Sequence, residues 1–424
     1  MIETRAARER AYLIGVQLPG TTSKALAEQM RELVELTRTA GGEVVGTDVQ
    51  RRDEVEPALF VGRGKVDEIR ARCEELRLDL VICNEDLSPR QQRNLEKELG
   101  LRVVDRTELI LDIFAQHART REGRLQVEAA QLRHLLPRLV GAYDYHRQMG
   151  GIGTRGGPGE AQIEVERRRI RRRMRGLDQE LAQVRMQRVQ QRASRHRSDL
   201  PTVAIVGYTN AGKSTLINAL TGAGVIAEDT LFATLDPTTR RLRLPAGREV
   251  LLTDTVGFIQ KLPTDLVAAF RATLEEVTFA DVVLQVVDAA AEAAEEQART
   301  VDEILAELGA AEKPRVVALN KVDLLGPVTL RRAMRAFSER YAALVPISAL
   351  RGSGLDALGD AIDAATADRY VALEVLVPYG REGVLQELRQ YGDLERVEYR
   401  EGGTYARGRA PRELAHRFQP YQTD

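Results

Sequence analysis

Short apolar runs alternate with stretches of helical periodicity along the first 118 residues of the chain. Apolar runs at 12–16 and 44–49 are typical of strands, and residues 23–39 between them repeat apolar positions at helical spacing. Further short strands are expected at 58–61, 78–83 and 103–104. Because strands that alternate with helices of about 10–15 residues form parallel sheets, this region predicts a small parallel α/β domain.

Capping residues place the start of one helix in this domain. In Ser88-Pro89-Arg90-Gln91 the serine can cap the helix, the proline suits its first position, and the glutamine completes a capping box. The stretch Gly62-Arg63-Gly64-Lys65 also precedes a helix and could attract an anion. An ordinary strand–helix turn is the favoured interpretation of that stretch, because two glycines and a lysine are a weak motif.

Two heptad stripes with a glycine-rich stretch between them follow. Apolar residues recur at Leu125, Ala129, Leu132, Leu136, Leu139 and Tyr143, and again at Ile163, Ile170, Met174, Leu177, Leu181 and Val184. Such stripes can pack as an antiparallel helical hairpin, with the glycine-rich residues 150–160 as the loop at its tip. Pro137 is expected to kink or restart the first helix, because proline lacks the N–H that a helix interior uses.

Charge is distributed unevenly, although the net charge is only −1. Residues 137–199 hold 15 arginines, no lysine and 7 acidic residues, a net charge of +8, whereas residues 200–368 carry a net charge of −7. Like charges one helical turn apart disfavour an isolated helix, so this segment predicts a polyanionic partner. We expect phosphate-backbone contacts from Arg155, Arg168, Arg171 and Arg172. A solvated structural coil is the alternative interpretation.

The most specific motif in the chain is Gly207-Tyr208-Thr209-Asn210-Ala211-Gly212-Lys213-Ser214, which matches G-x-x-x-x-G-K-S. The apolar run 203–206 before it is typical of a buried parallel strand, and residues 216–220 after it are typical of a helix. A phosphate-binding loop requires this context, because its backbone N–H groups face the phosphates at a helix N-terminus. Lys213 would reach the β- and γ-phosphates, and the Ser214 hydroxyl would bind Mg²⁺.

Two shorter motifs follow in the order expected of a nucleotide-dependent switch. The first is Phe232-Ala233-Thr234-Leu235-Asp236, in which Thr234 is placed to complete the Mg²⁺ shell and to sense the γ-phosphate. The second is Asp254-Thr255-Val256-Gly257 after a strand at 250–253; its carboxylate would hold Mg²⁺ through a water, and the Gly257 N–H would face the γ-phosphate. No catalytic group can be assigned, and Lys213, Thr234 and Gly257 are the candidates nearest the γ-phosphate.

The last two motifs predict the base. Asn320-Lys321-Val322-Asp323 follows the apolar run 316–319, and Ser348-Ala349-Leu350 follows a strand at 343–347. The Asp323 carboxylate can accept hydrogen bonds from N1–H and the 2-amino group of guanine, and adenine has no donor at either place. A site built for such donors rejects an analogue that lacks them by roughly 10⁴–10⁵. The chain is therefore expected to bind GTP and GDP, with Mg²⁺ as cofactor, and to hydrolyse GTP.

Phe258 stands where many regulatory GTPases carry the glutamine that orients the attacking water. Because a phenyl ring cannot hold a water by hydrogen bonding, unaided turnover is expected to be slow, on the order of 10⁻⁴–10⁻² s⁻¹. A partner would then complete the site by ordering the loops around Thr234 and Phe258. The alternative interpretation is that Phe258 is simply a core anchor.

Composition limits the class of protein further. Hydrophobic residues make up 43% and charged residues 29%, as in soluble globular proteins. Apolar runs long enough for a membrane span and an apolar signal-peptide core at the N-terminus are both missing from the sequence, so we expect a cytoplasmic protein without integral membrane association. Cys73 and Cys83 are the only cysteines, which excludes a disulfide framework and a thiolate zinc site.

The expected fold class is α/β, and we divide the chain into four parts. These are an N-terminal α/β domain (1–123), a basic helical hairpin with a glycine-rich tip (124–199), a P-loop GTPase domain (200–368) and a small α+β domain (369–424). In the last part we expect a strand at 371–377, a helix at 383–390, a hairpin at 396–407 and a short helix that begins at Pro411.

With these residues in view, the chain resembles the HflX family of GTPases over nearly its whole length. Besides the GTPase motifs, the resemblance rests on Phe60-Val61-Gly62-Arg63-Gly64-Lys65-Val66, Asn84-Glu85-Asp86-Leu87-Ser88-Pro89-Arg90-Gln91, Asp105-Arg106-Thr107-Glu108-Leu109-Ile110-Leu111-Asp112-Ile113-Phe114, Gln126-Val127-Glu128 and the glycine-rich loop. That loop departs from the usual family pattern by one additional glycine in Gly156-Gly157-Pro158.

The resemblance implies a translation-factor-related GTPase that binds the large ribosomal subunit and its rRNA, and that splits stalled or idle ribosomes under stress. We expect a monomer with no DNA partner. An alternative is an RNA-binding or NTP-driven RNA-remodelling protein whose GTPase domain is only a regulatory switch. A third possibility is a GTPase that acts on a protein partner, with the hairpin as a structural coil.

Overall fold

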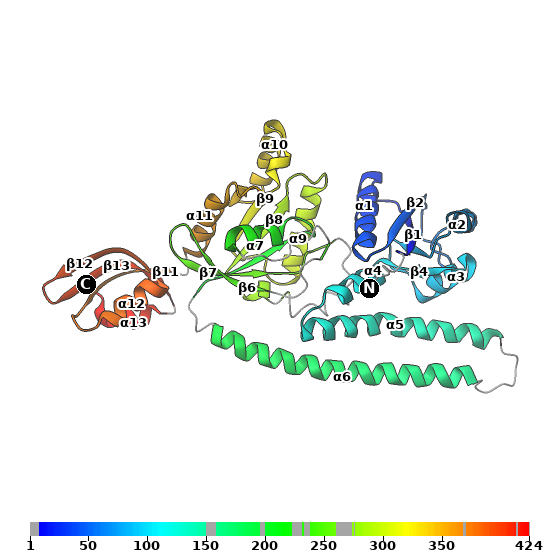
Figure 1. The fold of residues 1–424 in the computed structure, drawn as a ribbon, viewed down its shortest axis with the longest axis horizontal. Coiled ribbons are helices and arrows are strands. Elements are labelled where there is room, and N and C mark those ends of the chain that lie inside the picture. Colours follow the sequence, from blue (N-terminus) through cyan, green and yellow to red (C-terminus); the bar gives the residue numbers. More distant parts are fainter. Residues whose placement is uncertain are drawn as a thin grey trace, which may run out of the picture. The chain divides into compact units, whose positions relative to one another are not determined.

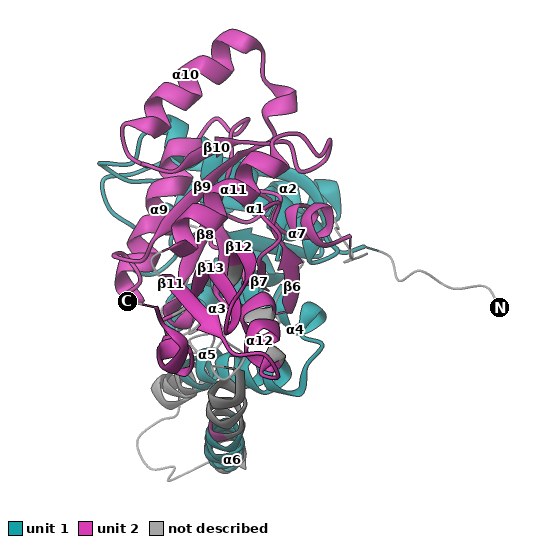
Figure 2. Ribbon diagram, turned by 90° about the vertical axis from the view of Figure 1, so that its left-hand side faces the viewer, with its two compact units in different colours: residues 1–184, 229–235, 260–271 teal, residues 185–228, 236–259, 272–424 magenta. Residues whose placement is uncertain are grey.

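A computed structural model describes residues 8–149, 158–195, 200–222, 231–232, 238–259, 274, 276–367, 370–412 and 414–423. The chain divides into two compact units, which Figure 2 colours separately. The first unit comprises residues 1–184, 229–235 and 260–271, and the second comprises 185–228, 236–259 and 272–424. The short stretch 229–235 therefore groups with the N-terminal residues, although its neighbours in sequence belong to the second unit.

The first unit contains the expected parallel sheet, with strand order β2-β1-β3-β4 (Figure 1). Its elements are β1 (Arg10–Gln17), α1 (Ser23–Thr39), β2 (Glu43–Arg51), α2 (Arg63–Leu76), β3 (Leu80–Cys83), α3 (Pro89–Leu99), β4 (Arg102–Val104) and α4 (Arg106–His117). Tyr12 and Ile14 of β1 pack in one core cluster with Ile69 of α2 and Leu95 of α3. Leu13 is also fully buried, so β1 is covered on both faces, as a parallel strand requires.

Local hydrogen bonds explain where the helices of this sheet begin. The capping box predicted at Ser88 is confirmed: its hydroxyl accepts from the Gln91 N–H, and the Gln91 side chain accepts from the Ser88 N–H at 2.9 Å. Thr22 caps α1 through the Ala25 N–H, and Asp105 caps α4 through the Glu108 N–H. Each cap satisfies one N–H that the first helical turn leaves without an internal partner.

The strand expected at 58–61 is wrong. This stretch is a turn closed by a single bridge between Glu56 and Phe60. Side chains of α3 bind its backbone, because Gln91 Nε2 donates to the Glu56 carbonyl at 2.8 Å and Asn94 Nδ2 donates to the Ala58 carbonyl at 2.9 Å. The carbonyls that a neighbouring strand would use are therefore already occupied.

The glycine–lysine stretch at the start of α2 is an ordinary turn, as favoured from the sequence. Lys65 Nζ lies 2.8 Å from Asp48 and 2.8 Å from Glu68. The Gly62 N–H donates to Gln50 Oε1 at 2.7 Å. The lysine and the first amide that an anion would need are thus engaged within the protein.

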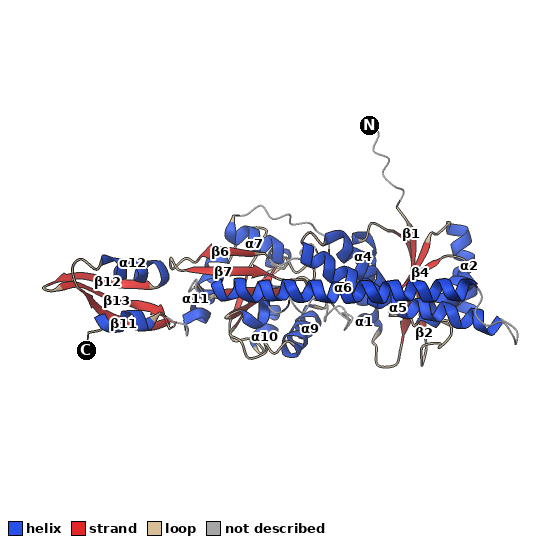
Figure 3. Cartoon of the chain, turned by 90° about the horizontal axis from the view of Figure 1, so that it is seen from below, coloured by secondary structure: helices blue, strands red, loops and turns tan. Residues whose placement is uncertain are grey.

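The two heptad stripes form α5 (Arg121–Met149) and α6 (Pro158–Arg195), which lie side by side in Figures 1 and 3. Leu125 and Ala129 of α5 pack with Leu177 of α6. Ion pairs cross the seam from Arg173 to Glu128 at 2.6 Å, from Arg121 to Glu180 at 3.2 Å and from Arg133 to Asp178 at 3.0 Å. These pairs match early residues of one helix with later residues of the other, so the two helices are antiparallel.

Helix α5 continues through Pro137, so the expected restart at this residue is wrong. Proline removes one intrahelical hydrogen bond, a loss of about 3 kcal/mol in a helix interior. Pro137 is exposed, which leaves the freed carbonyl accessible to water. The apolar contacts and ion pairs before Pro137, and the Arg138–Asp105 pair directly after it, are compatible with one continuous helix.

The second unit contains a six-stranded sheet of order β10-β9-β8-β5-β7-β6, in which only β6 is antiparallel to its neighbour. Its elements are β5 (Thr202–Gly207), α7 (Lys213–Thr221), β6 (Thr239–Arg243), β7 (Glu249–Asp254), β8 (Val282–Asp288), α9 (Ala294–Glu307), β9 (Arg315–Asn320), η1 (Val322–Leu324), α10 (Pro327–Ser338), β10 (Leu344–Pro346) and α11 (Leu355–Thr366). The central strand β5 is buried by apolar residues, since Val203, Ala204, Ile205 and Val206 are all fully buried.

A separate three-stranded antiparallel sheet of order β11-β13-β12 follows. Its elements are β11 (Tyr370–Val377), α12 (Glu382–Tyr391), β12 (Asp393–Arg400), β13 (Gly403–Pro411) and α13 (Ala415–Phe418). The helix expected to begin at Pro411 is wrong, because Pro411 is the last residue of β13, paired with Tyr370. A strand end tolerates the missing N–H. The fold class is confirmed as α/β, and within the described residues no helix is long and apolar enough to cross a membrane.

The buried carboxylate of Asp105 connects several elements of the first unit. It accepts hydrogen bonds from the Leu87 N–H at 3.2 Å and the Glu108 N–H at 2.8 Å, and it pairs with Arg138. Burial would raise its pKa, but contacts from His134, Arg138 and the Glu108 N–H together hold the pKa of Asp105 below its usual value. The ionised form is thus the stabilising one.

We therefore expect Asp105→Asn to destabilise this sheet by about 3 kcal/mol, because the buried Arg138 loses its counter-charge. Since the folded-state pKa of Asp105 is lowered, its contribution is present above the unfolded-state pKa of about 4 and is lost as the pH falls through the folded-state value. Hydrogen exchange of α4 amides measures the effect. Asp67→Asn, which removes an exposed carboxylate from α2, is the matched control. Equal protection in both variants would contradict this role.

Candidate functional site

The predicted phosphate loop and Asp254 lie at the same edge of the six-stranded sheet. The loop follows β5, and Asp254 is the last residue of β7. These two strands are parallel neighbours, with Ile205 in register with Asp254. The sheet order therefore brings together two motifs that are about forty residues apart in the sequence.

The loop from Gly207 to Lys213 turns back on itself before α7 begins. Asn210 and Gly212 both have positive φ, +58° and +94°. A Cβ on Gly212 would also lie 2.3 Å from Asn320 Nδ2, so no other residue fits there without a shift of its neighbours. Helix α7 begins directly at Lys213, which directs its free N–H groups toward the loop.

Lys213 is buried against the loop that precedes it. Its Nζ donates to the Gly207 carbonyl at 3.1 Å and to the Tyr208 carbonyl at 2.8 Å. Burial lowers the pKa of Lys213 to about 8, and the nearby Asp254 charge opposes that shift. The ammonium is thus fixed at the centre of the loop, close to the carboxylate at the end of β7.

Residues 254–257 approach the phosphate loop closely. Asp254 and Thr255 are buried, and the Thr255 hydroxyl donates to the Ile205 carbonyl at 2.5 Å. A Cβ on Gly257 would lie 3.0 Å from Lys213 Nζ and 2.9 Å from Thr209 Cγ2. Only a glycine lets the backbone come this near to the lysine.

Phe258 is attached to the loop by its backbone. Its N–H donates to the Gly207 carbonyl at 3.1 Å, and its carbonyl accepts from the Thr209 N–H at 2.8 Å. The side chain is 1% exposed. Phe258 therefore lies where a core anchor would. A side chain at position 258 points into the core rather than to solvent.

Asn320 connects three parts of the site. Its side-chain Nδ2 donates to the Ala211 carbonyl at 2.9 Å, and its Oδ1 accepts from the Ala349 N–H at 3.0 Å. It is buried at the end of β9. The phosphate loop, the Asn320–Asp323 motif and the Ser348–Leu350 motif are therefore assembled around one amide group.

Asp323 and its surroundings form the other end of this assembly. A hydrogen bond from the Ser348 side chain lowers the pKa of Asp323, so its carboxylate is ionised and able to accept. Arg351 Nε lies 3.6 Å from Asp323 Oδ2, and Lys321 pairs with Asp288 at 2.8 Å. The sequence did not identify Arg351 and Asp288 as neighbours of this motif, although Arg351 directly follows Ser348-Ala349-Leu350. Leu350 is 81% exposed.

Of the expected segment 232–236, only Phe232 is described; Ala233, Thr234, Leu235 and Asp236 lie outside the described residues. The Phe232 ring is buried in the first unit, edge-on to Phe114 of α4 with the ring centroids 4.6 Å apart. The neighbouring Leu231 N–H donates to Thr39 Oγ1 at 3.3 Å. No signal in the sequence paired these residues, because they are more than one hundred positions apart.

The basic residues expected to contact phosphate are distributed over α6 and the tip. Arg155 lies outside the described residues. Arg168, Arg171 and Arg172 are exposed; Arg168 lies 3.4 Å from Glu164, whereas Arg171 and Arg172 form no ion pair within the described parts of the chain. Arg175 is exposed on the same helix face, one turn further along.

Comparison with known proteins connects this site to a family. Residues 27–115 match the family described as GTP-binding GTPase N-terminal, residues 117–195 its middle region, and residues 202–321 the family described as 50S ribosome-binding GTPase. The chain is 44% identical to GTPase HflX of Caldanaerobacter subterraneus subsp. tengcongensis, over 99% of this chain and 95% of that protein. It is 45% identical to GTPase HflX of Escherichia coli, over 85% of this chain and 84% of that protein.

Among solved structures, the chain is similar to a GTP-binding protein from the archaeon Sulfolobus solfataricus in complex with GDP. The TM-score is 0.46 at 26% identity, over 85% of this chain and 99% of that one. The sequence matches to the HflX proteins extend along nearly the whole chain, and they include all the motifs assembled at the sheet edge. The chain therefore belongs to the HflX family of GTPases and is a GTP hydrolase.

Proposed function

We propose that this GTPase binds the large ribosomal subunit through its helical hairpin and, in the GTP-bound form, splits stalled or idle ribosomes. The description of the family that matches residues 202–321, a 50S ribosome-binding GTPase, supports the ribosome as partner. One structural observation carries the proposal: an exposed arginine face along α6, in which, among the described residues, only Arg168 has an acidic partner, Glu164. Ribosomal RNA is the polyanion that such a face fits best.

This face lies opposite the seam that joins α6 to α5. Leu177 points into the seam and is fully buried. Arg168, Arg172 and Arg175 are spaced by three or four residues and are exposed. In an isolated helix such like charges repel one another. Neutralisation by phosphates would release counterions and remove this repulsion.

We assign the nucleotide to the assembly around Asn320. The N–H groups at the start of α7 and the Lys213 ammonium would hold the phosphates. Asp323 would accept from guanine N1–H and its 2-amino group, and Ser348 supports the ionised carboxylate. Asn320 makes no hydrogen bond to the base in this assignment. Its two amide hydrogen bonds keep the base-reading motif and the phosphate loop at a fixed separation.

The residues present fit Mg²⁺ as cofactor. Ser214 in the first turn of α7 and the buried Asp254 at the end of β7 offer the oxygen ligands that this cation prefers. We assign Ser214 and Thr234 as ligands and Asp254 as a residue that acts through a water. Bound Mg²⁺ would neutralise charge on the β- and γ-phosphates. Order in the segments around Thr234 and Gly257 would then depend on the γ-phosphate, and hydrolysis would relax them and release the protein.

Co-sedimentation with purified ribosomal subunits tests the proposal. The wild-type chain is expected to sediment with large subunits in GTP or a non-hydrolysable analogue and to dissociate in GDP. Charge reversal of Arg168, Arg171 and Arg172 to glutamate should weaken this association and reduce its salt dependence by roughly one unit of slope per lost contact. Reversal of Arg331 and Arg332, exposed on α10, is the matched control.

Two outcomes would contradict the proposal. Association that does not change over about 50–300 mM salt would exclude the phosphate contacts. Unwinding of RNA duplexes without ribosomes, together with no binding to large subunits, would favour the RNA-remodelling alternative. Splitting itself is measured as conversion of 70S particles to free subunits on sucrose gradients in the presence of GTP.

The assignment of Asp323 predicts a change of base preference. In Asp323→Asn the side chain presents one acceptor and one donor, which no longer match the two donors of guanine. GTP affinity is expected to fall by a factor on the order of 10² or more, and xanthosine triphosphate should become the preferred ligand. Fluorescent-nucleotide titration measures both. Asp360→Asn, an exposed carboxylate on α11, should leave the preference unchanged. ATP binding as tight as GTP binding in the wild type would refute the assignment.

The position of Phe258 predicts slow hydrolysis that glutamine cannot rescue. The side chain at 258 is buried and its backbone is bonded to the phosphate loop, so a glutamine there cannot reach an attacking water. Single-turnover hydrolysis by the free wild-type chain and by Phe258→Gln should both stay on the order of 10⁻⁴–10⁻² s⁻¹. Large subunits should accelerate the wild type. Phe279→Gln, at a half-exposed site, controls for the chemical change. Fast hydrolysis by the free wild type, unchanged by ribosomes, would show that the chain has a complete catalytic site of its own.

A further inference from the structure

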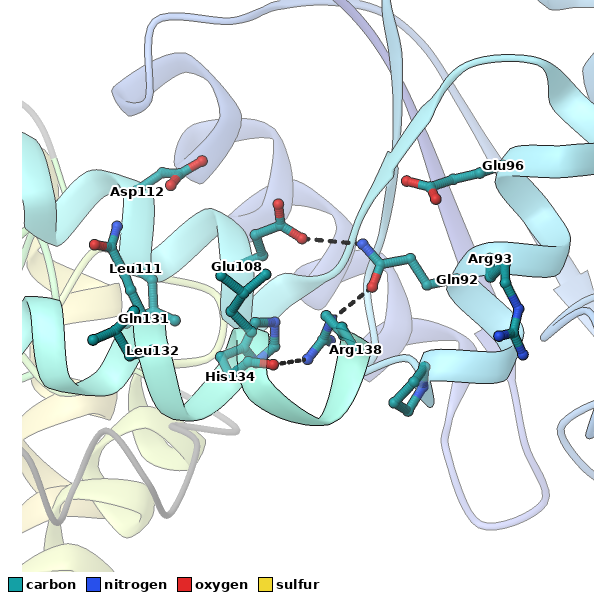
Figure 4. Close-up of a pocket in the computed structure, with 12 residues that line it drawn as sticks. Gln92, Arg93, Glu96, Glu108, Leu111, Asp112, Gln131, Leu132, His134 and Arg138 are labelled. Atoms are coloured by element: carbon teal, nitrogen blue, oxygen red, sulfur yellow. Dashed lines mark hydrogen bonds between the residues drawn. The ribbon is translucent and has the colours of Figure 1, made fainter. Parts of the chain in front are cut away.

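A cavity of about 500 Å³ lies among α3, α4 and α5 of the first unit (Figure 4). All of its lining residues belong to this unit, and none belongs to the assembly around Asn320. Its volume is within the range of small-molecule sites, about 300–1,000 Å³. Its lining is unusual for a space between packed helices, because seven of the twelve lining residues are charged or carry an amide. Such side chains are rarely turned toward an interior without a partner.

One end of the cavity has an excess of negative charge. Glu108 and Asp112 of α4 line it, with Glu96 of α3 close by. Arg102 of β4 forms ion pairs with both α4 carboxylates, 2.8 Å from Glu108 and 3.8 Å from Asp112. Burial raises the pKa of Glu96 and of Asp112, and the Glu108 charge raises both further. The negative charge of the three carboxyl groups exceeds the positive charge of the single guanidinium, so a second cation can bind beside them.

The other end lacks a hydrogen-bond acceptor. Arg93 of α3 lines the cavity, and its Nε and Nη1 are buried with no hydrogen-bond partner within the described residues. Buried donors are bonded in the great majority of cases, so each exception indicates a missing group. Figure 4 shows Arg93 and Asp112 at opposite sides of the cavity. The excess of negative charge and the arginine without a hydrogen-bond partner therefore lie at opposite sides of the cavity.

Apolar side chains also line the cavity, and Figure 4 labels Leu111 and Leu132 on the side of Asp112. Leu111 comes from α4, and Leu132 and Leu135 come from α5. Leu135 is 43% exposed, although the cavity beside it could shelter an apolar group. An aliphatic chain would bury this surface, at roughly 25 cal/mol for each Å² removed from water.

We propose that this cavity binds a basic amino acid: a small zwitterion with an aliphatic chain, a cationic nitrogen group toward Asp112 and Glu108, and a carboxylate toward Arg93. A bare metal ion does not fit as well. Asp105, Glu108 and His134 do place ligand atoms within 4.8 Å of one another. However, Arg138 already pairs with Asp105, and Arg102 already pairs with Glu108.

A set of matched ligands tests the proposal on the full-length chain. L-arginine carries a carboxylate and a cationic side chain, agmatine lacks the carboxylate, and citrulline lacks the cationic charge of the side chain. By calorimetric titration, arginine is expected to bind at one saturable site, and agmatine and citrulline are each expected to bind about tenfold to a hundredfold more weakly. Lysine and ornithine vary the chain length and the cation.

Two variants assign the ends of the ligand. Arg93→Gln should weaken arginine binding to the level of agmatine and leave agmatine unaffected. Asp112→Asn should weaken arginine and agmatine and leave citrulline unaffected. Arg90→Gln on α3 and Glu75→Gln on α2 remove exposed charges outside the lining and should change nothing. Unchanged hydrogen exchange of α3 and α4 amides in all four variants shows that the first unit is folded.

Three results would overturn the proposal. The first is absence of saturable binding by arginine, lysine and ornithine alike. The second is equal binding of arginine, agmatine and citrulline. The third is displacement of arginine by ATP in a manner that Arg93→Gln abolishes, which would assign the cavity to a nucleotide instead. The proposed ribosomal function does not enter into any of these readouts, so the two proposals fail independently.

Discussion

The nucleotide site depends on two hydrogen bonds from one buried amide. Asn320 donates to Ala211 in the phosphate loop and accepts from Ala349 in the motif after β10. Because an amide has a donor side and an acceptor side, it fixes the orientation of both partners; a carboxylate could serve only one of them. Gly212 is required for the same reason, since a side chain there would collide with Asn320. In the proposed assignment, base selection at Asp323 would depend on this assembly, because Asn320 sets the separation of the phosphate loop from the base-reading motif.

The sequence predicts most reliably those elements that are stabilised by their own neighbours. The capping box at Ser88 and the phosphate loop are local patterns, and both positions agree with the structure. The predictions that failed concern residues whose partners are distant in the sequence. The stretch 58–61 is held as a turn by side chains of α3, and Pro411 ends a strand whose partner is Tyr370. Sequence periodicity carries no information about such contacts.

The same limit applies to the segment before Thr234. The order of motifs assigns Phe232 to the nucleotide, yet its ring is buried against Phe114, and Leu231 is bonded to Thr39. Removing a phenyl ring from such a place costs roughly 1.5–3 kcal/mol of apolar burial. Any rearrangement of this segment therefore includes a free-energy term from α1 and α4. The nucleotide motifs cannot be treated as a property of the six-stranded sheet alone.

Arginines on the hairpin serve two purposes, and helical position decides between them. Arg173 and Arg133 lie at the seam, where each pairs with an acid of the other helix. Arg171 and Arg172 lie on the outer face, where the described chain offers them no acid. Within the described part of the hairpin, the seam has few buried apolar residues. Repulsion on the outer face therefore opposes the apolar seam, and the polyanion proposed as partner would stabilise the hairpin at the same time as it binds. In that proposal, binding and ordering of the hairpin are coupled by the same charges.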